Sequence, residues 1–144
     1  MYRIKTFLCA VCALVYTVLG VVAVRYMNTA RLAQIEGERV YYTRYASSNA
    51  LVKTELGLLD IFQLRGESVC FACKVDEEET VNRLIKTYGA EIFIKEDACG
   101  VRSYYAYSPK LGKGINIDGV TINLHIAFQG EACAVGTPII FGGF

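Results

Sequence analysis

The sequence predicts an α+β protein, with an N-terminal transmembrane helix followed by a mostly antiparallel β-sheet that carries one helix packed on a face. Three observations predict this class. An uncharged apolar run fills residues 7–24, an amphipathic helix follows Asp76, and the chain after Gly89 alternates apolar and polar residues with a period of two. One helix ahead of a series of strands is typical of an antiparallel sheet with a helix on one side.

The apolar run extends from Phe7 to Val24 and contains neither a charge nor a proline. As a helix it would cover roughly 27 Å, which is close to the hydrocarbon thickness of a bilayer. Tyr2 and Tyr26 flank it where aromatic rings prefer the headgroup layer. A cleaved secretory signal would need a shorter apolar core and small residues at the cleavage site, and Arg25 interrupts that pattern. We therefore predict an uncleaved signal anchor that binds the membrane through this run.

The anchor divides the chain into three parts. Residues 1–27 are the predicted signal-anchor helix, residues 28–38 a juxtamembrane segment, and residues 39–144 a small α+β domain. Basic residues flank the anchor almost equally, so the positive-inside rule chooses no orientation. Long folded segments cross the membrane largely regardless of their charge, which favours an exported domain. The alternative is a cytoplasm-facing domain with free thiols that serves as a membrane-tethered adaptor.

Charge excludes nucleic acid as the expected partner. Residues 1–26 hold three of the 15 basic residues and no acidic ones, so 12 basic residues face 14 acidic ones in the remainder. A protein that neutralises phosphates needs a surplus of Lys and Arg on one face. The densest charge run, DEEE at 76–79, has the opposite sign and is expected to cap a helix.

The helix after this run is the best predicted element of the domain. Asp76 can accept backbone N–H bonds as an N-cap, and Gly89 is expected to end the helix. Apolar residues recur between them at helical spacing, at Val81, Leu84, Ile85 and Tyr88.

Strands are predicted on both sides of the helix. Before it we expect strands at 40–46 and 68–75, a turn at 65–67, and strands or short helices around Gly57. After it we expect strands at 90–96 and 101–109, a glycine-bearing connection, a hairpin turn at Asp118–Gly119 and a strand over 120–128. In that strand the apolar positions face away from Asn123, His125 and Ala127. Strands at 132–136 and 137–144 close the chain.

The cysteines offer the sharpest hint of chemistry. In a strand over 68–75, Cys73 faces the core and Cys70 faces away, so the two thiols do not form a one-sided metal clip or redox pair. Cys99 and Cys133 complete the domain's set. Two disulfides among these four are favoured if the domain is exported, and separate buried thiols are the simpler alternative. Together with His125 they could also form a Cys₃His zinc site, a thiol- or zinc-dependent alternative for the function.

No catalytic constellation is visible, and no cofactor is expected. His125 lies on the polar face of its strand, and no serine or aspartate is spaced to form a triad with it. Tyrosines gather in two strands and are candidates for a partner surface, because tyrosine gives large contact area at small entropic cost. Ordinary sheet packing is the alternative interpretation. The candidate partner surface consists of Tyr41, Tyr42, Tyr45, Tyr104, Tyr105 and Tyr107.

The C-terminal part resembles a known family. The elements YAYSP at 105–109, INLHIAF at 122–128 and VGTPIIFGGF at 135–144 are similar to the closing third of the YwmB-like family of Gram-positive exported proteins. The resemblance covers about the last 70 residues. It implies a fold like that of the TATA-box-binding protein, a curved antiparallel sheet with a helix on its convex side. It also implies a place outside the cytoplasmic membrane of spore-forming bacteria, without an established activity.

The sequence as a whole predicts a single-pass membrane protein that presents a small exported binding or assembly domain. We expect it to act on a protein partner rather than by catalysis, with a link to the cell envelope or to sporulation by the resemblance. The thiol- or zinc-dependent site at Cys70, Cys73, Cys99 and Cys133 is the alternative.

Overall fold

The computed structural model describes residues 2–27, 29–43 and 51–141. The chain divides into two compact units, Met1–Ala30 and Arg31–Phe144. The first unit consists of the helix α1 (Tyr2–Met27), and the second is an α+β domain. The predicted fold class is confirmed.

Helix α1 contains a segment, Ile4–Met27, that is long and apolar enough to cross a membrane, with a mean hydropathy of 2.6. A signal sequence near an N-terminus can meet the same criteria of length and composition. The hydroxyl of Thr17 donates to the Ala13 carbonyl at 2.8 Å, so this polar group is satisfied within the helix.

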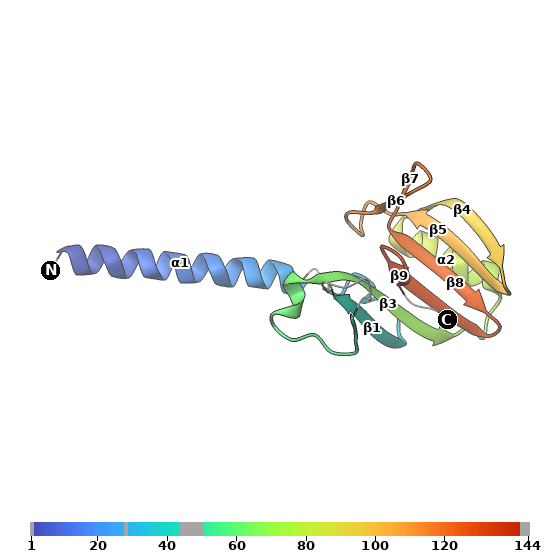
Figure 1. Cartoon of the computed structure of the whole chain (residues 1–144), viewed down its shortest axis with the longest axis horizontal. Coiled ribbons are helices and arrows are strands. Elements are labelled where there is room, and N and C mark those ends of the chain that lie inside the picture. Colours follow the sequence, from blue (N-terminus) through green and yellow to red (C-terminus); the bar gives the residue numbers. More distant parts are fainter. Residues whose placement is uncertain (1, 28, 44–50, 142–144) are drawn as a thin grey trace. The chain divides into compact units, whose positions relative to one another are not determined.

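The domain is built on a seven-stranded sheet in the order β2-β1-β3-β9-β8-β5-β4, and every neighbouring pair is antiparallel (Figure 1). Its strands are β1 (Glu38–Thr43), β2 (Leu51–Lys53), β3 (Leu64–Ala72), β4 (Glu91–Ala98), β5 (Val101–Tyr107), β8 (Leu124–Gln129) and β9 (Ala132–Thr137). The short strands β6 (Ile115–Ile117) and β7 (Val120–Ile122) form a separate hairpin. A 3₁₀ turn, η1 (Asp60–Phe62), precedes β3.

The two ends of the sheet differ in the chain segments that meet there. At the end that we call proximal, β3 begins, β9 ends at Thr137 and β5 ends at Tyr107. The chain also enters the domain at this end, because the N–H of Leu32 donates to the Glu67 side chain near the start of β3. At the opposite, distal end lie Ala72, the β4–β5 turn and the β8–β9 turn.

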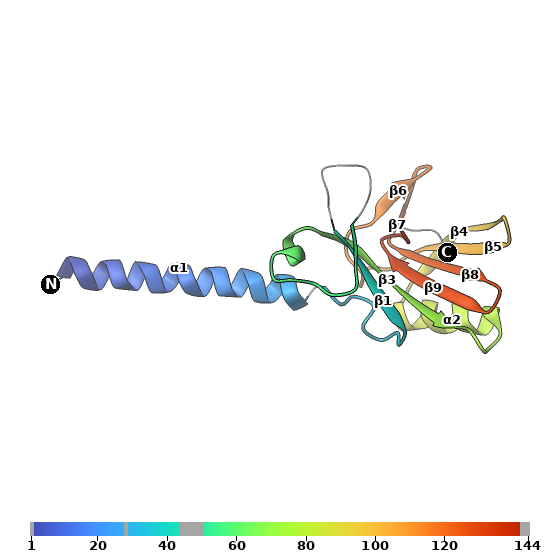
Figure 2. The same ribbon diagram turned by 60° about the horizontal axis from the view of Figure 1, so that its bottom comes forward.

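Helix α2 (Glu77–Tyr88) covers one face of the sheet, the inner face (Figure 2). Asp76 caps it by accepting from the backbone N–H groups of Glu78 and Glu79, and Gly89 ends it with φ +59°. Burial of each large apolar side chain stabilises the fold by about 1.5–3 kcal/mol. The core beneath α2 is formed by Val69, Val81, Leu84, Tyr88, Ala106, Leu124, Ile126, Phe128, Cys133 and Val135, with Leu32, Ile35 and Leu111.

Asn123 separates β7 from β8, so the strand predicted over 120–128 is wrong at its middle. Its amide is fully buried and makes three hydrogen bonds. Oδ1 accepts from the Ser108 N–H, and Nδ2 donates to the carbonyls of Ser108 and Gly112. The Ser108 hydroxyl in turn donates to the Tyr88 carbonyl at the end of α2. Hydrogen bonds between Ser108 and Asn123 therefore join the YSP stretch at 107–109 to the NL stretch at 123–124.

The chain after β9 corrects another prediction. Residues 138–141 form no strand, and 142–144 lie outside the described residues. This segment folds back over the uncovered, outer face of the sheet, where the Ile140 N–H donates to His125 Nδ1 at 3.4 Å and Phe141 packs on Tyr42. A Cβ on Gly136 would meet Ile140 Cγ1 at 2.7 Å, so the close approach requires glycine.

Further boundaries differ from the sequence prediction, and the strand predicted over 68–75 ends at Ala72. Residues 65–67 lie inside β3 rather than in a turn, and the glycine-bearing connection contains β6. Strand β4 forms one edge of the sheet, with a bulge at Phe93 and the charged residues Lys95, Glu96 and Asp97.

Candidate functional site

Three surface hollows meet at Phe71, toward the distal end of the domain. The largest, about 600 Å³, is an open depression lined by Gly37, Glu38, Cys70, Ala72, Glu131 and Ala132 as well as Phe71. A second, of about 310 Å³, lies between α2 and the segment before β1, and a third, of about 200 Å³, lies beside Cys73. Arg83 of α2 lines both smaller hollows. Because one half-buried aromatic side chain lines all three, we treat them as one surface, the Phe71 surface.

The two thiols of the CFAC stretch have opposite environments, as predicted, although β3 ends at Ala72 and Cys73 follows it. Phe71 and Cys73 pack against the core cluster, while Cys70 is exposed. The Cys73 thiol donates to the Val75 carbonyl at 3.2 Å and lies 3.3 Å from the Thr80 hydroxyl of α2. Burial, with a smaller effect of Glu38, raises the pKa of Cys70. A protonated thiol suits packing against a partner better than nucleophilic attack.

The other two cysteines lie elsewhere. Cys133 is fully buried on β9 opposite Phe71, and burial strongly raises its pKa. Cys99 is exposed in the β4–β5 turn with φ +54°. All six cysteines of the chain are free thiols in the structure. Among the described residues no three His, Cys, Asp or Glu side chains are grouped to hold a metal ion. The Cys₃His arrangement is therefore not assembled, and disulfide pairing stays a prediction.

His125 lies on the outer face beneath the C-terminal segment. Its ring stacks on Tyr105, with centroids 4.3 Å apart, and burial lowers its pKa to about 4. Because Nδ1 accepts from the Ile140 N–H, the neutral ring carries its proton on Nε2. That atom is buried without a hydrogen-bond partner among the described residues. The histidine is thus a neutral packing residue of the outer face.

The tyrosines of the predicted partner surface do not share one environment. Tyr42 is buried, and its hydroxyl lies 2.8 Å from that of Ser68. Tyr104 packs on Phe128 at the inner face and donates to Glu77. The Tyr105 hydroxyl donates to Glu96 across the outer face. Tyr41 and Tyr107 are half-buried, and Tyr45 lies outside the described residues.

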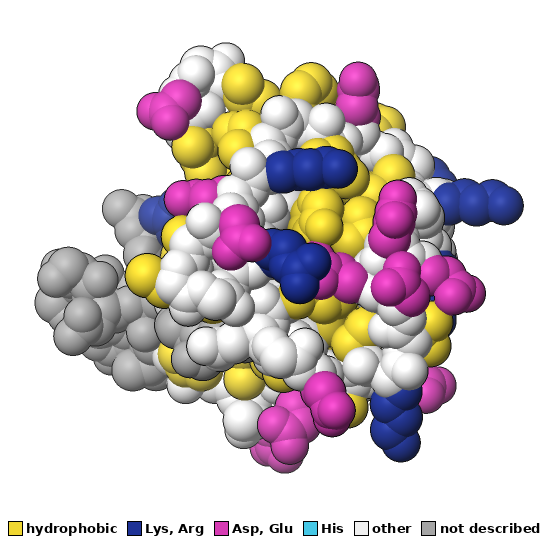
Figure 3. All heavy atoms as spheres, turned by 90° about the vertical axis from the view of Figure 1, so that its right-hand side faces the viewer, with side chains coloured by type: hydrophobic (Ala, Val, Ile, Leu, Met, Phe, Trp, Pro, Cys, Tyr) yellow, Lys and Arg dark blue, Asp and Glu magenta, His cyan; other side chains and the backbone are white. Residues whose placement is uncertain are grey.

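Acidic side chains surround the distal end. Asp76 precedes α2, and the first turn of this helix adds Glu77, Glu78 and Glu79. Glu38 and Glu131 border the largest hollow. Figure 3 views this end of the domain and shows acidic groups spread around exposed hydrophobic atoms, with fewer basic groups between them. Such a surface suits a partner with an apolar anchor flanked by basic residues.

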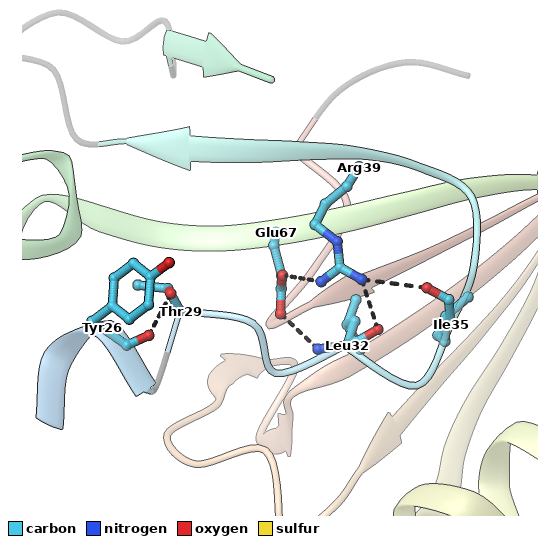
Figure 4. A network of polar contacts seen from close by, with 6 residues as sticks. All are labelled: Tyr26, Thr29, Leu32, Ile35, Arg39 and Glu67. Carbon is cyan, nitrogen blue, oxygen red and sulfur yellow. Dashed lines mark hydrogen bonds and ion pairs between the residues drawn. The ribbon is translucent and has the colours of Figure 1, made fainter. Parts of the chain in front are cut away.

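An ion pair with a buried carboxylate fixes the strand that carries this surface. Glu67 of β3 is 1% exposed, accepts from the Leu32 N–H at 2.7 Å and pairs with Arg39 at 3.0 Å (Figure 4). Arg39 also donates to the carbonyls of Leu32 and Ile35. Burial raises the pKa of Glu67, against the lowering effects of the Leu32 amide and of Arg39. The network ties the segment before β1 to β3.

Sequence reasoning missed several members of this arrangement. Arg83 and Glu131 show no pattern that would assign them to a common surface, because they come from α2 and from the turn before β9. The burial of Glu67 was also missed, since the residue follows a glycine in a stretch that is typical of a turn.

Comparisons of the chain with protein-family models, with curated proteins and with solved structures find no match.

Proposed function

We propose that this protein is anchored in a membrane by one helix and presents an exported, non-catalytic α+β domain that binds a protein partner through the Phe71 surface. The carrying observation is α1, whose segment Ile4–Met27 combines spanning length, a mean hydropathy of 2.6 and exposed side chains almost throughout. A mostly apolar helix of this length with exposed side chains favours a lipid surrounding.

The position of the Phe71 surface supports the binding role. The chain enters the domain at the proximal end, and the Phe71 surface lies toward the opposite end of β3. A tether at one end leaves the other end free to meet a partner. The acidic border formed by Glu38 and Glu131 favours a basic partner and speeds its approach.

The resemblance to the YwmB-like family extends this proposal. A member of that family would act outside the cytoplasmic membrane of a Gram-positive bacterium, in the cell envelope or in sporulation.

Labelling of the exposed thiols tests the location. Intact bacterial cells that produce the full chain are treated with a membrane-impermeant maleimide, with and without prior reduction, beside a lysed sample. We expect labelling of Cys70 and Cys99 in intact cells and its loss in the Cys70→Ser/Cys99→Ser variant, since both thiols are exposed. Labelling that needs reduction would reveal a disulfide, and labelling only after lysis would replace the exported domain by the cytoplasm-facing adaptor.

Charge reversal tests the binding surface. In a Cys99→Ser background, a photoactivatable maleimide on Cys70 should form one defined crosslinked complex in cells, and Glu38→Lys/Glu131→Lys should reduce its yield. The control, Glu55→Lys/Glu91→Lys, changes two exposed carboxylates outside the Phe71 surface and should leave the yield unchanged. Equal yields from both double variants would contradict a partner at the Phe71 surface.

A further inference from the structure

The loop between β2 and β3 exposes apolar side chains that the domain does not use. Leu58 is 68% exposed, Leu59 76% and Phe62 48%, while Ile61 between them is buried and holds the loop to the domain. Val52 of the neighbouring strand β2 is 55% exposed. Single exposed apolar residues are ordinary, but a concentration of this kind on one short stretch marks a contact surface.

Hydrogen bonds hold this loop in shape, so the exposure is part of its fold. The Asp60 carboxylate accepts from Lys53 Nζ at 2.6 Å and from the Gly57 N–H at 2.8 Å. The Asp60 N–H returns a bond to the Gly57 carbonyl at 3.0 Å. Leu58 and Leu59 lie between these two clamped residues, and their side chains remain exposed.

The loop lies at the proximal end of the domain. It leads into Leu64, the first residue of β3, three positions before Glu67, which accepts from the Leu32 N–H. Figure 2 shows η1 at the end of the sheet where β3 begins. Only residues 28–30 separate α1 from Arg31, and so short a segment spans no more than about 10–15 Å. An anchored α1 therefore keeps this end of the domain within reach of the bilayer surface.

Two exposed basic residues lie near the loop. Arg31 and Arg65 are exposed near the proximal end, while Lys53 beside the loop is paired with Asp60. The distal end carries the acidic first turn of α2 and Glu131. An anionic bilayer surface attracts the basic residues and repels the acidic end. Leucine and phenylalanine side chains beside basic residues are typical of segments that lie in the membrane interface.

We propose that residues 57–62 insert Leu58, Leu59 and Phe62 into the interfacial layer of the bilayer that α1 spans. This second contact rests on the proposed membrane anchor. This contact would fix the orientation of the domain, with the Phe71 surface facing away from the bilayer. A flexible tether alone would not fix the orientation.

The chain contains no tryptophan, so single substitutions supply a unique fluorophore. The full chain is reconstituted in vesicles of phosphatidylcholine and phosphatidylglycerol, either without brominated lipids or with lipids brominated near the top or near the end of the acyl chain. Three variants are compared. Phe62→Trp reports the loop, and Val75→Trp is the matched control at the distal end, because the two native side chains are 48% and 49% exposed. Tyr16→Trp, in the middle of α1, reports the anchor.

We expect bromine to quench Tyr16→Trp and to lower the emission of Phe62→Trp by about twofold, with Val75→Trp unchanged. Quenching of Tyr16→Trp alone would overturn the loop contact and leave the anchor standing. Absence of quenching at Tyr16→Trp would overturn the anchor and the loop contact with it. A blue-shifted but unquenched Phe62→Trp would assign the loop to a protein contact and overturn the proposal.

Discussion

Asn123 and Ser108 are joined by two hydrogen bonds of 2.7 Å, one accepted and one donated by the asparagine amide. A third bond from the same amide reaches the Gly112 carbonyl at 2.8 Å. These side-chain bonds lie where β7 gives way to β8, beside a backbone bond from the Asn123 N–H to the Ala106 carbonyl, and they hold the chain between β5 and β6. The Ser108 hydroxyl joins this segment to the end of α2.

Asn123→Ala should therefore lower the free energy of unfolding by about 3 kcal/mol, because it leaves buried backbone groups without partners. Pulse proteolysis of the full chain in detergent over a urea series measures this change. Asn116→Ala is the control, since that amide is exposed and caps only the Gly119 N–H. Equal losses in the two variants would contradict a structural role for the buried amide.

Arg39 compensates the buried carboxylate of Glu67. Arg39→Met should cost about 2–4 kcal/mol at neutral pH, because it leaves a buried charge without its partner. The same urea series measures the loss, and Glu67→Gln in the Arg39→Met background should recover part of it. A double variant as unstable as Arg39→Met would show that the arginine acts by packing and by its bonds to carbonyls rather than by its charge.

Glu67 also predicts a pH dependence. Burial raises its pKa in the folded state, so the folded protein holds this proton more tightly than the unfolded chain does. The resulting stabilisation is fully present below the ordinary pKa near 4.5 and is lost as the pH rises through the raised value. Relative to the wild type, the Glu67→Gln variant should gain stability as the pH rises across this window. If the free energies of unfolding of the two proteins changed in parallel with pH, Glu67 would not be the source of the dependence.

His125 predicts a dependence of the opposite sign. Burial lowers its folded-state pKa from 6.5 to about 4, so the unfolded chain binds the proton first as the pH falls. Stability should decline by about 3 kcal/mol between pH 6.5 and 4. His125→Phe keeps a ring against Tyr105 and should flatten this part of the curve. A variant that retains the full acid-induced loss would assign that loss to other groups.

Gly136 allows the C-terminal segment to lie on the sheet. Gly136→Ala should displace residues 138–141, break the bond from Ile140 to His125 and destabilise the domain by about 1–3 kcal/mol. Hydrogen exchange at the Ile140 amide should become at least about tenfold faster. The control is Gly100→Ala, where φ is +79° but no atom lies within 4 Å of the added carbon. Gly100→Ala should cost about 1 kcal/mol of backbone strain, and the hydrogen-exchange rate of the Ile140 amide should not change.

The sequence predicted those elements whose signals are local. Asp76, the apolar spacing that follows it and Gly89 define α2 within one short stretch, and the structure confirms them. The facing of Cys70 and Cys73 followed from the period of a strand. These features depend on neighbouring residues, so no tertiary contact was needed to find them.

The features that were missed depend on residues far apart in the chain. Residues 137–144 have a strand-like composition, but Pro138 cannot donate to a ladder, and Gly136 and Gly66 leave room for the chain to fold back instead. Asn123 alternates correctly with its neighbours, and only its contacts with Ser108 and Gly112 show why the strand is divided there. The Phe71 surface combines β3, α2 and the turn before β9, which no linear pattern links.

Strand β4 has a consequence for how copies of the proposed membrane-anchored protein would meet. Confinement to two dimensions makes neighbouring molecules meet often, and an edge strand with unpaired backbone groups is a template for joining one sheet to the next. The bulge at Phe93 breaks the regular edge, and Lys95, Glu96 and Asp97 would have to lose water for a second strand to dock. This edge therefore disfavours sheet-to-sheet joining between copies that the proposed anchor would hold in one membrane.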